Sequence, residues 1–202
     1  MLILSGGGDP EKVVPIDIFF SEQIDKDRTV LYIPLAMEER CFTYKECYNW
    51  FKNTYGQYGV SNIKMCIDLK EEPSDLSEYA AVFIGGGNTF KLLKMIKESN
   101  FDQKLIRYLL DGGIIYGGSA GAIIFGKTIR TALHADENYV GLTDLNGLNV
   151  LENKDIWCHY SEKDDKLICN YDNELYLLYE ASGLVLDDKK IIGIGKSYKI
   201  KH

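Results

Sequence analysis

Ile114-Ile115-Tyr116-Gly117-Gly118-Ser119-Ala120-Gly121 is a short apolar run that leads directly into a cluster of small residues. The apolar part is typical of a buried β-strand, and residues 120–125 can form a buried helix after it. The glycines around Ser119 allow the backbone to turn sharply between the two elements. Strand, tight turn and helix in this order predict an α/β fold with Ser119 at the carboxyl end of a strand.

Outward from this stretch, apolar runs of strand length alternate with amphipathic runs of helix length, which is typical of a parallel α/β sheet. Strands are expected at 2–4, 30–33, 63–67, 80–84, 114–116 and 156–160, and helices at 15–24, 42–58, 89–98, 101–111 and 171–180. Residues 183–187 and 191–194 are expected to form a terminal hairpin that turns at Asp188-Lys189. The pattern predicts a single domain over residues 1–202, with a flavodoxin-like, doubly wound, mostly parallel sheet and an antiparallel C-terminal extension.

Composition narrows the classes of function. The net charge is −7 and no Lys/Arg stripe is present, so we expect no nucleic-acid partner. No apolar run approaches the roughly 20 residues that span a bilayer, and the first residues are too short and uncharged for a signal peptide, so we expect a cytoplasmic protein without a membrane partner. The five cysteines are scattered without a C-x-x-C spacing, which favours reduced thiols and predicts no metal or other cofactor.

Ser119 is the candidate nucleophile of a serine hydrolase. A serine hydroxyl needs a positioned base, and a sharp strand-to-helix turn lifts it clear of its surroundings. The helix after it would present free N–H groups to a developing oxyanion. A glycine-rich turn of this kind also suits phosphate binding or close packing, and the pentapeptide alone leaves these alternatives open.

A second glycine loop, Gly85-Gly86-Gly87-Asn88, ends another expected strand and opens another helix. Because the carboxyl ends of parallel strands share one edge of the sheet, this loop and Ser119 could face one crevice. The N–H groups of Gly86 and Gly87 could then join that of Ala120 in an oxyanion hole. The alternative is dinucleotide binding, although the final glycine of G-x-G-x-x-G is absent.

Only three histidines are available as a base. His159 lies on a short apolar strand, where a histidine is often a hydrogen-bonded core residue. The serine turn makes it the leading candidate nevertheless. His134 lies in a polar loop and is a weaker candidate, and His202 is the last residue.

The acid that orients the base stays open at this point. Asp188 and Asp187, at the expected hairpin turn, follow His159 in the chain, and Asp136 and Glu162 are alternatives. Acidic residues at such turns are commonly turn formers.

Three motifs together resemble a known family: Ile84-Gly85-Gly86-Gly87-Asn88-Thr89-Phe90, Gly117-Gly118-Ser119-Ala120-Gly121-Ala122 and Cys158-His159-Tyr160. They are similar to the serine peptidases that include aspartyl dipeptidase (peptidase E) and cyanophycinase. The resemblance implies a fold akin to the class I glutamine amidotransferases, with serine in place of their cysteine. It also implies a metal-independent peptidase that forms an acyl-enzyme on Ser119 with His159 as base. Asp188 would match the family's hairpin glutamate.

The expected substrate is a small peptide, with a dipeptide carrying an N-terminal aspartate as one candidate. Arg130 would hold the substrate carboxylate, with Asn88 as a second substrate-binding residue. The chain departs from the dipeptidases after Ile129-Arg130-Thr131, where His134 falls at an acidic position and Asp136 comes two residues late. Alternatives are an esterase or amidase and a non-catalytic flavodoxin-like module that binds a nucleotide or anion. The oligomeric state is left open between monomer and homodimer.

Overall fold

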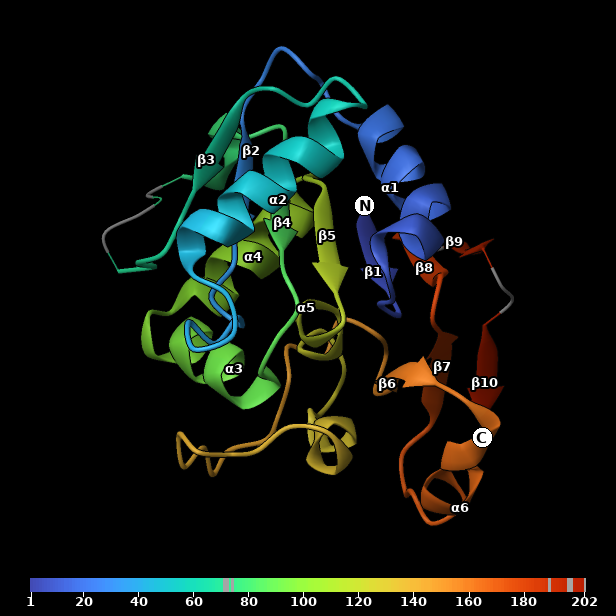
Figure 1. Cartoon of the computed structure of the whole chain (residues 1–202). Helices are drawn as coiled ribbons and strands as arrows, with labels where there is room; N and C mark the ends of the chain where they lie inside the picture. The colour runs from blue at the N-terminus through green and yellow to red at the C-terminus, as the bar shows by residue number, and fades with distance from the viewer. Residues whose placement is uncertain (71–72, 74, 189, 196–197, 202) are drawn as a thin grey trace.

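A computed structural model describes residues 1–70, 73, 75–188, 190–195 and 198–201. Its main element is a seven-stranded sheet in the order β3-β2-β4-β5-β1-β8-β9 (Figure 1). The bounds are β1 Leu2–Ser5, β2 Val30–Ile33, β3 Ile63–Met65, β4 Ala81–Ile84, β5 Ile115–Gly118, β8 Ser182–Asp187 and β9 Lys190–Gly195. β1 to β5 run parallel, while β8 and β9 are antiparallel to their neighbours. The expected mostly parallel sheet with an antiparallel C-terminal extension is confirmed.

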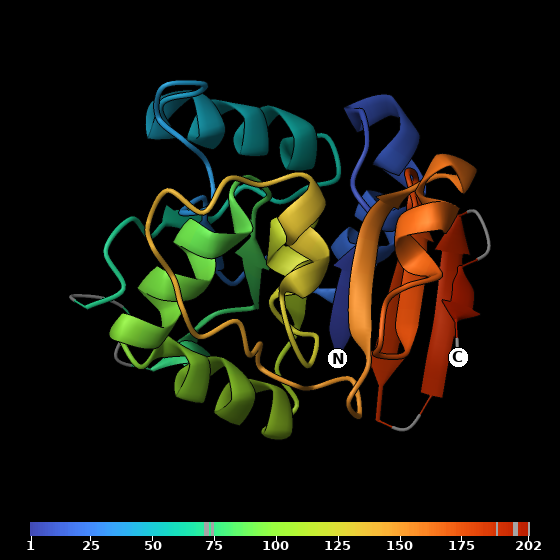
Figure 2. The same ribbon diagram turned by 90° about the horizontal axis from the view of Figure 1, so that it is seen from below.

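Helices cover both faces of this sheet. α1 (Pro10–Gln23) and α2 (Tyr44–Gly56) lie on one face, and α3 (Thr89–Glu98) and α4 (Phe101–Leu110) on the other (Figure 2). β1, β2 and β4 are buried along their whole length, because a parallel sheet between two helical layers has no face toward water. No helix in the described ranges is long and apolar enough to cross a membrane.

The two sheet faces carry different side chains. Leu31, Ile84 and their neighbours pack with the aliphatic side chains of α3 and α4. Tyr32, Phe83 and Tyr116 point to the opposite face and join an aromatic cluster under α1 and α2. Successive residues of a strand face opposite sides, so one strand contributes to both cores.

A second sheet of three strands lies beside the first, in the order β10-β7-β6. Its strands are β6 (Asp155–Tyr160), β7 (Leu175–Tyr179) and β10 (Lys199–Lys201), and a short helix, α6 (Asp165–Ile168), connects β6 to β7. β6 and β7 are parallel, and β10 is antiparallel to β7.

The helix expected at 171–180 is wrong. Leu175–Tyr179 is strand β7, and its first four residues are all buried. A helix would turn part of such a run toward solvent, whereas a strand between β6 and β10 buries it on both sides. The terminal hairpin is as expected: β8 pairs with β9 from Ser182↔Gly195 to Asp187↔Lys190. Lys189, at the expected turn, lies outside the described residues.

Candidate active site

Ser119 occupies the turn between β5 and a one-turn helix, α5 (Ala120–Ile123), with φ 49° and ψ −110°. Non-glycine residues rarely adopt this backbone conformation, and it persists only where the surroundings enforce it. Close packing of the turn supplies that constraint. A Cβ on Gly117 would overlap the Gly121 carbonyl, and a Cβ on Gly121 would overlap that of Ile84. The small residues therefore hold the half-buried serine in a strained conformation.

His159 reaches Ser119 from the other sheet. Its Nε2 lies 2.9 Å from Ser119 Oγ, which is hydrogen-bonding distance. His159 has φ 54° and sits where the β6–β7 register shifts between Trp157 and Tyr160. Its N–H donates to the Gly6 carbonyl (2.9 Å) just beyond β1. The bulge thus turns the imidazole out of a buried strand and toward the serine.

Gly7 packs directly against the imidazole. It has φ +83°, and a Cβ at this position would overlap the ring of His159. The glycine is required both by its backbone conformation and by the contact. The loop after β1 therefore fixes one face of the imidazole.

The neighbouring thiol does not take part. Cys158 is buried, and its Sγ lies 3.7 Å from the Ser5 carbonyl oxygen and 3.6 Å from that of Ser119. Burial raises the pKa of this thiol well above its usual range. Cys158 stays protonated and packs beneath the serine.

Glu180 faces the other ring nitrogen of the base. Its Oε1 lies 3.6 Å from His159 Nδ1, an ion-pair distance that is longer than a good hydrogen bond. Its Oε2 accepts a hydrogen bond from Lys12 Nζ (3.0 Å). The hydrogen bond from Lys12 is the main cause of a lowered pKa of the Glu180 carboxyl, with a smaller electrostatic contribution from His159. Glu180 is therefore a carboxylate in position to stabilise a protonated imidazole.

The structure does not bring Asp188 to His159, so its expected place as the acid needs correction. Asp188 follows β8, whose last residues pair with the beginning of β1 at Leu2. Ser119 follows β5, whose last residue pairs with the end of β1 at Ser5. The two residues therefore lie at opposite edges of the sheet. Asp187 shares that location, and both acids lie near the terminal ammonium group.

The other two candidate acids have structural partners. Asp136 Oδ2 accepts from the N–H of Thr89 (2.8 Å) at the start of α3. Glu162 Oε1 accepts from the Tyr179 hydroxyl (3.3 Å). The sequence analysis does not single out Glu180, because the helix expected at 171–180 includes it. The available signal was a run of polar and small residues, Glu180 to Gly183, between two apolar runs.

The glycine loop lies against the serine as expected. A Cβ on Gly86 would come within 3.3 Å of Ser119 Cβ, and Gly87, with φ +138°, is packed on the Ala36 carbonyl. The N–H groups of Gly86 and Gly87 make no backbone hydrogen bond with any described residue. Ala120 begins α5, so its N–H has no partner within the helix. These are the donors expected for an oxyanion hole.

The two expected substrate-binding residues are placed elsewhere. Asn88 is 6% exposed and caps α3: its Oδ1 accepts from the Lys91 N–H and its Nδ2 donates to the Glu137 carbonyl. Its polar atoms are engaged, as is common for asparagine at a helix start. Arg130 is exposed at the start of a 3₁₀ turn, near Tyr171, and does not line the cavity at Ser119.

The remaining histidines are not at the serine. His134 Nδ1 lies 2.7 Å from the Thr131 carbonyl, and its ring stacks on Trp157. His202 lies outside the described residues. No cluster of three or more His, Cys, Asp or Glu suited to a metal ion occurs in the described ranges.

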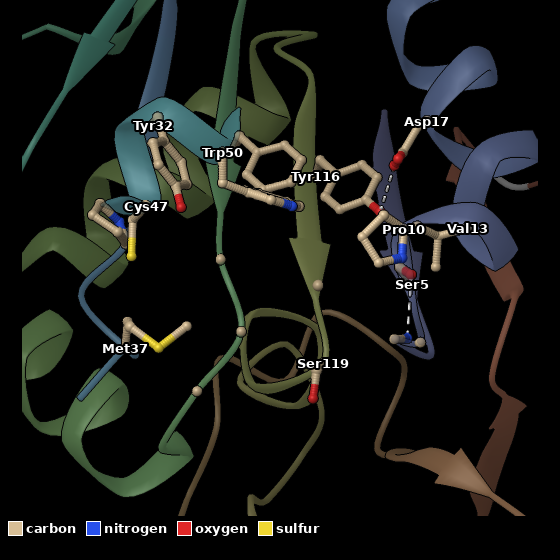
Figure 3. A pocket seen from close by; sticks show the side chains of 18 of the residues that line it. Ser5, Pro10, Val13, Asp17, Tyr32, Met37, Cys47, Trp50, Tyr116 and Ser119 are labelled. Atoms are coloured by element: carbon tan, nitrogen blue, oxygen red, sulfur yellow. Dashed lines mark hydrogen bonds between the residues drawn. The ribbon is translucent and has the colours of Figure 1, made fainter. Parts of the chain in front are cut away.

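A cavity of about 640 Å³ opens beside Ser119 and His159 and extends between α1 and α2 (Figure 3). Ser5, Gly7 and the 85–87 loop form its rim near the serine. Its far part is lined by aromatic side chains from the sheet and from α2. A small substrate can therefore reach the serine hydroxyl from this largely apolar cavity.

A strained serine, a histidine on its hydroxyl and a glycine loop at the end of a parallel sheet define a serine hydrolase site. The comparisons identify the family: the profile of peptidase family S51 matches residues 1–199, and the chain belongs to that family. It is a serine peptidase, a hydrolase.

Relatives include an uncharacterized peptidase of Listeria monocytogenes, 26% identical over 89% of this chain and 92% of its own. Peptidase E of Haemophilus influenzae is 31% identical over 52% of this chain and 47% of its own, and a probable alpha-aspartyl dipeptidase of Drosophila melanogaster is 28% identical over 57% and 45%. A crystal structure of a Listeria monocytogenes protein provisionally described as Peptidase E has the same fold, with a TM-score of 0.77 at 23% identity over 97% of this chain and 98% of that one.

Proposed function

We propose that this peptidase cleaves short peptides through an acyl-enzyme on Ser119. The observation that carries the proposal is the 2.9 Å contact between Ser119 Oγ and His159 Nε2, made by residues that both have positive φ. Strained backbone at two residues that meet across two sheets is typical of a catalytic pair. The size of the cavity, about 640 Å³, favours short substrates over folded proteins.

In the proposed reaction, Ser119 Oγ attacks the carbonyl carbon of the peptide bond and passes its proton to His159 Nε2. The N–H groups of Gly86, Gly87 and Ala120 stabilise the negative charge on the carbonyl oxygen. Collapse of this intermediate breaks the C–N bond, and the leaving amine takes the proton from Nε2. A water molecule then releases the acyl group by the same steps, with His159 again as base.

Glu180 is the proposed acid of the triad, in place of Asp188. Its carboxylate faces Nδ1 and would stabilise the imidazolium that forms at each proton transfer. The separation of 3.6 Å leaves room for a shorter contact once substrate is bound, because catalytic hydrogen bonds are often long in the free enzyme.

An activity-based probe tests this proposal. A fluorophosphonate should label the protein once, at a peptide that contains Ser119, and Ser119→Ala should abolish the label. Ser99→Ala is the matched control, because the Ser99 hydroxyl caps α3 and lies outside the cavity. Folded protein that takes up no label and hydrolyses no short peptide would contradict the proposal.

A further inference from the structure

The cavity beside Ser119 has an aromatic wall. Tyr32, Phe83 and Tyr116 come from one face of β2, β4 and β5, and Trp50 and Tyr55 come from α2. Figure 3 shows Tyr32, Trp50 and Tyr116 along this wall, above Ser119. Phe42 and Trp50 are 56% and 39% exposed, so these two rings lie at the open side, whereas the other four rings are buried and form the floor behind them. A side chain entering here would exchange water for contact with the rings of Phe42 and Trp50.

The charges in the cavity have one sign. Its acidic residues are Asp17 and Glu46, and no Lys or Arg is found among the described residues that line it. The Glu46 carboxylate accepts from the N–H and hydroxyl of Thr43 at the start of α2. A substrate carboxylate placed in this cavity would lose its water without meeting a cation.

Asp17 is the buried member of the pair. It is 1% exposed, and its Oδ1 accepts hydrogen bonds from the hydroxyls of Tyr55 (2.7 Å) and Tyr116 (3.2 Å). Figure 3 shows it pointing from α1 toward Tyr116. Desolvation by burial is the main cause of a pKa raised to about 6, so the carboxyl is mostly ionised above that pH. The inner part of the cavity then carries a negative charge.

The position of His159 indicates which part of the substrate enters. The leaving amine must lie beside Nε2, which reaches Ser119 from the side of β1. Tyr32 and Phe83 of the aromatic wall stand on β2 and β4, which lie across β5, the strand that leads into Ser119, from β1. The acyl residue, whose carbonyl is attacked, therefore extends toward the wall.

Resting on the proposed peptidase function, we infer that this cavity binds the acyl-side residue and selects a large apolar or aromatic side chain. In the same site Asp17 disfavours an acidic side chain. Arg130 lies elsewhere, so no cation offsets that repulsion. The substrate class is short peptides with a residue such as phenylalanine or leucine on the acyl side.

Four dipeptides with a common second residue test the inference: Phe-Leu, Ala-Leu, Asn-Leu and Asp-Leu. We expect kcat/KM for Phe-Leu to exceed that for Ala-Leu by about 10- to 100-fold, the range for burial of one large apolar side chain. Asp-Leu should be cleaved several-fold more slowly than Asn-Leu, its uncharged counterpart of the same shape. Cleavage of Asp-Leu as fast as Phe-Leu would overturn the inference.

Two variants connect the preference to the cavity. Trp50→Ala should lower the Phe-Leu to Ala-Leu ratio, whereas Tyr139→Ala, which removes an exposed ring outside this cavity, should leave it unchanged. Asp17→Asn retains an acceptor for the hydroxyls of the two tyrosines. It should bring the ratio of kcat/KM for Asn-Leu to kcat/KM for Asp-Leu closer to one.

Fluorophosphonate labelling is measured on every variant, so a misfolded protein is recognised by loss of label. If Ser119 is labelled normally but neither variant shifts its kcat/KM ratio, the inference about the cavity is overturned and the proposed function is not. Loss of both labelling and hydrolysis in the folded wild type contradicts the proposed function instead.

Discussion

Ser119 stands at the end of a strand in the seven-stranded sheet, whereas His159 and Glu180 reach it from the ends of β6 and β7 in the three-stranded sheet. The serine turn is held partly by its own residues, since Gly117 packs on Gly121, and partly by β4 and β1, since Gly121 packs on the Ile84 carbonyl and the Ser119 N–H donates to the Ser5 carbonyl. The imidazole is held by residues more than 150 positions away, at Gly6 and Gly7. The proposed nucleophile therefore depends in part on close packing within its own turn, whereas the proposed base is held against residues that are distant in the sequence.

The largest effect is expected when the Ser119–His159 pair is removed. Ser119→Ala or His159→Ala should each lower kcat/KM by about 10⁴- to 10⁶-fold, and the double variant should be little worse than either single variant, because residues that act as a unit are not additive. Steady-state kinetics on a cleaved dipeptide measure this. Losses that multiply in the double variant would mean that the two residues act independently.

A smaller effect is expected at the acid. Glu180→Gln removes the charge that faces His159 Nδ1 and should lower kcat by about 10- to 10³-fold, since the exposed, long contact is weaker than a buried triad acid.

Asp188→Asn is the matched control for the acid, because it removes a carboxylate at the opposite edge of the sheet. It should leave kcat unchanged. The assignment of Glu180 fails if Asp188→Asn is the more damaging of the two.

The contact that positions the His159 imidazole is tested by Gly→Ala variants at two glycines. Gly7 and Gly112 have φ of +83° and +87°, but a Cβ at Gly112 meets no atom within 4 Å, whereas one at Gly7 overlaps His159. Both Gly→Ala variants carry the same backbone strain, of about 1 kcal/mol in folding stability.

Only Gly7→Ala should also slow fluorophosphonate labelling, by about 10- to 100-fold, because it displaces the base. Thermal unfolding and labelling rates measured side by side separate the two effects. Equal labelling by both variants would show that the contact does not position the imidazole.

The smallest effect concerns pH. Lys12 lowers the pKa of Glu180, so Lys12→Met should raise that pKa. The carboxylate is then lost at a higher pH, and the acid limb of the kcat/KM profile should move upward by a fraction of a pH unit. Lys45→Met, which removes an exposed lysine that forms no ion pair with a described residue, should leave the acid limb in place. A shift of the acid limb to lower pH in Lys12→Met would contradict the assigned effect of Lys12 on the pKa of Glu180.

The same contrast explains which features the sequence predicted. β2, β4 and β5 are continuous apolar runs because both faces of a parallel sheet are buried, so their positions were evident. Ser119 and the glycine loop were also evident, since glycines within a few residues mark each of them in the sequence. These features carry local signals.

Glu180 and the cavity could not be predicted in the same way. Leu175–Tyr179 is too short for its period to distinguish strand from helix, and only its pairing with β6 and β10 makes it a strand. Asn88 and Arg130 were expected at the substrate because of their residue types. Their roles were decided by the start of α3 and by an exposed 3₁₀ turn, which no short motif specifies.

Cys158 precedes His159 in the sequence and is buried, and its position affects how the enzyme can be inhibited. Its thiol points at two backbone carbonyls and stays protonated, so alkylating agents and mild oxidants cannot use it to reach the reaction centre. Such reagents will modify the exposed Cys41 and Cys169 instead. Turnover should therefore persist through iodoacetamide treatment or a shift in cellular redox state, conditions that would silence a hydrolase with a thiol nucleophile.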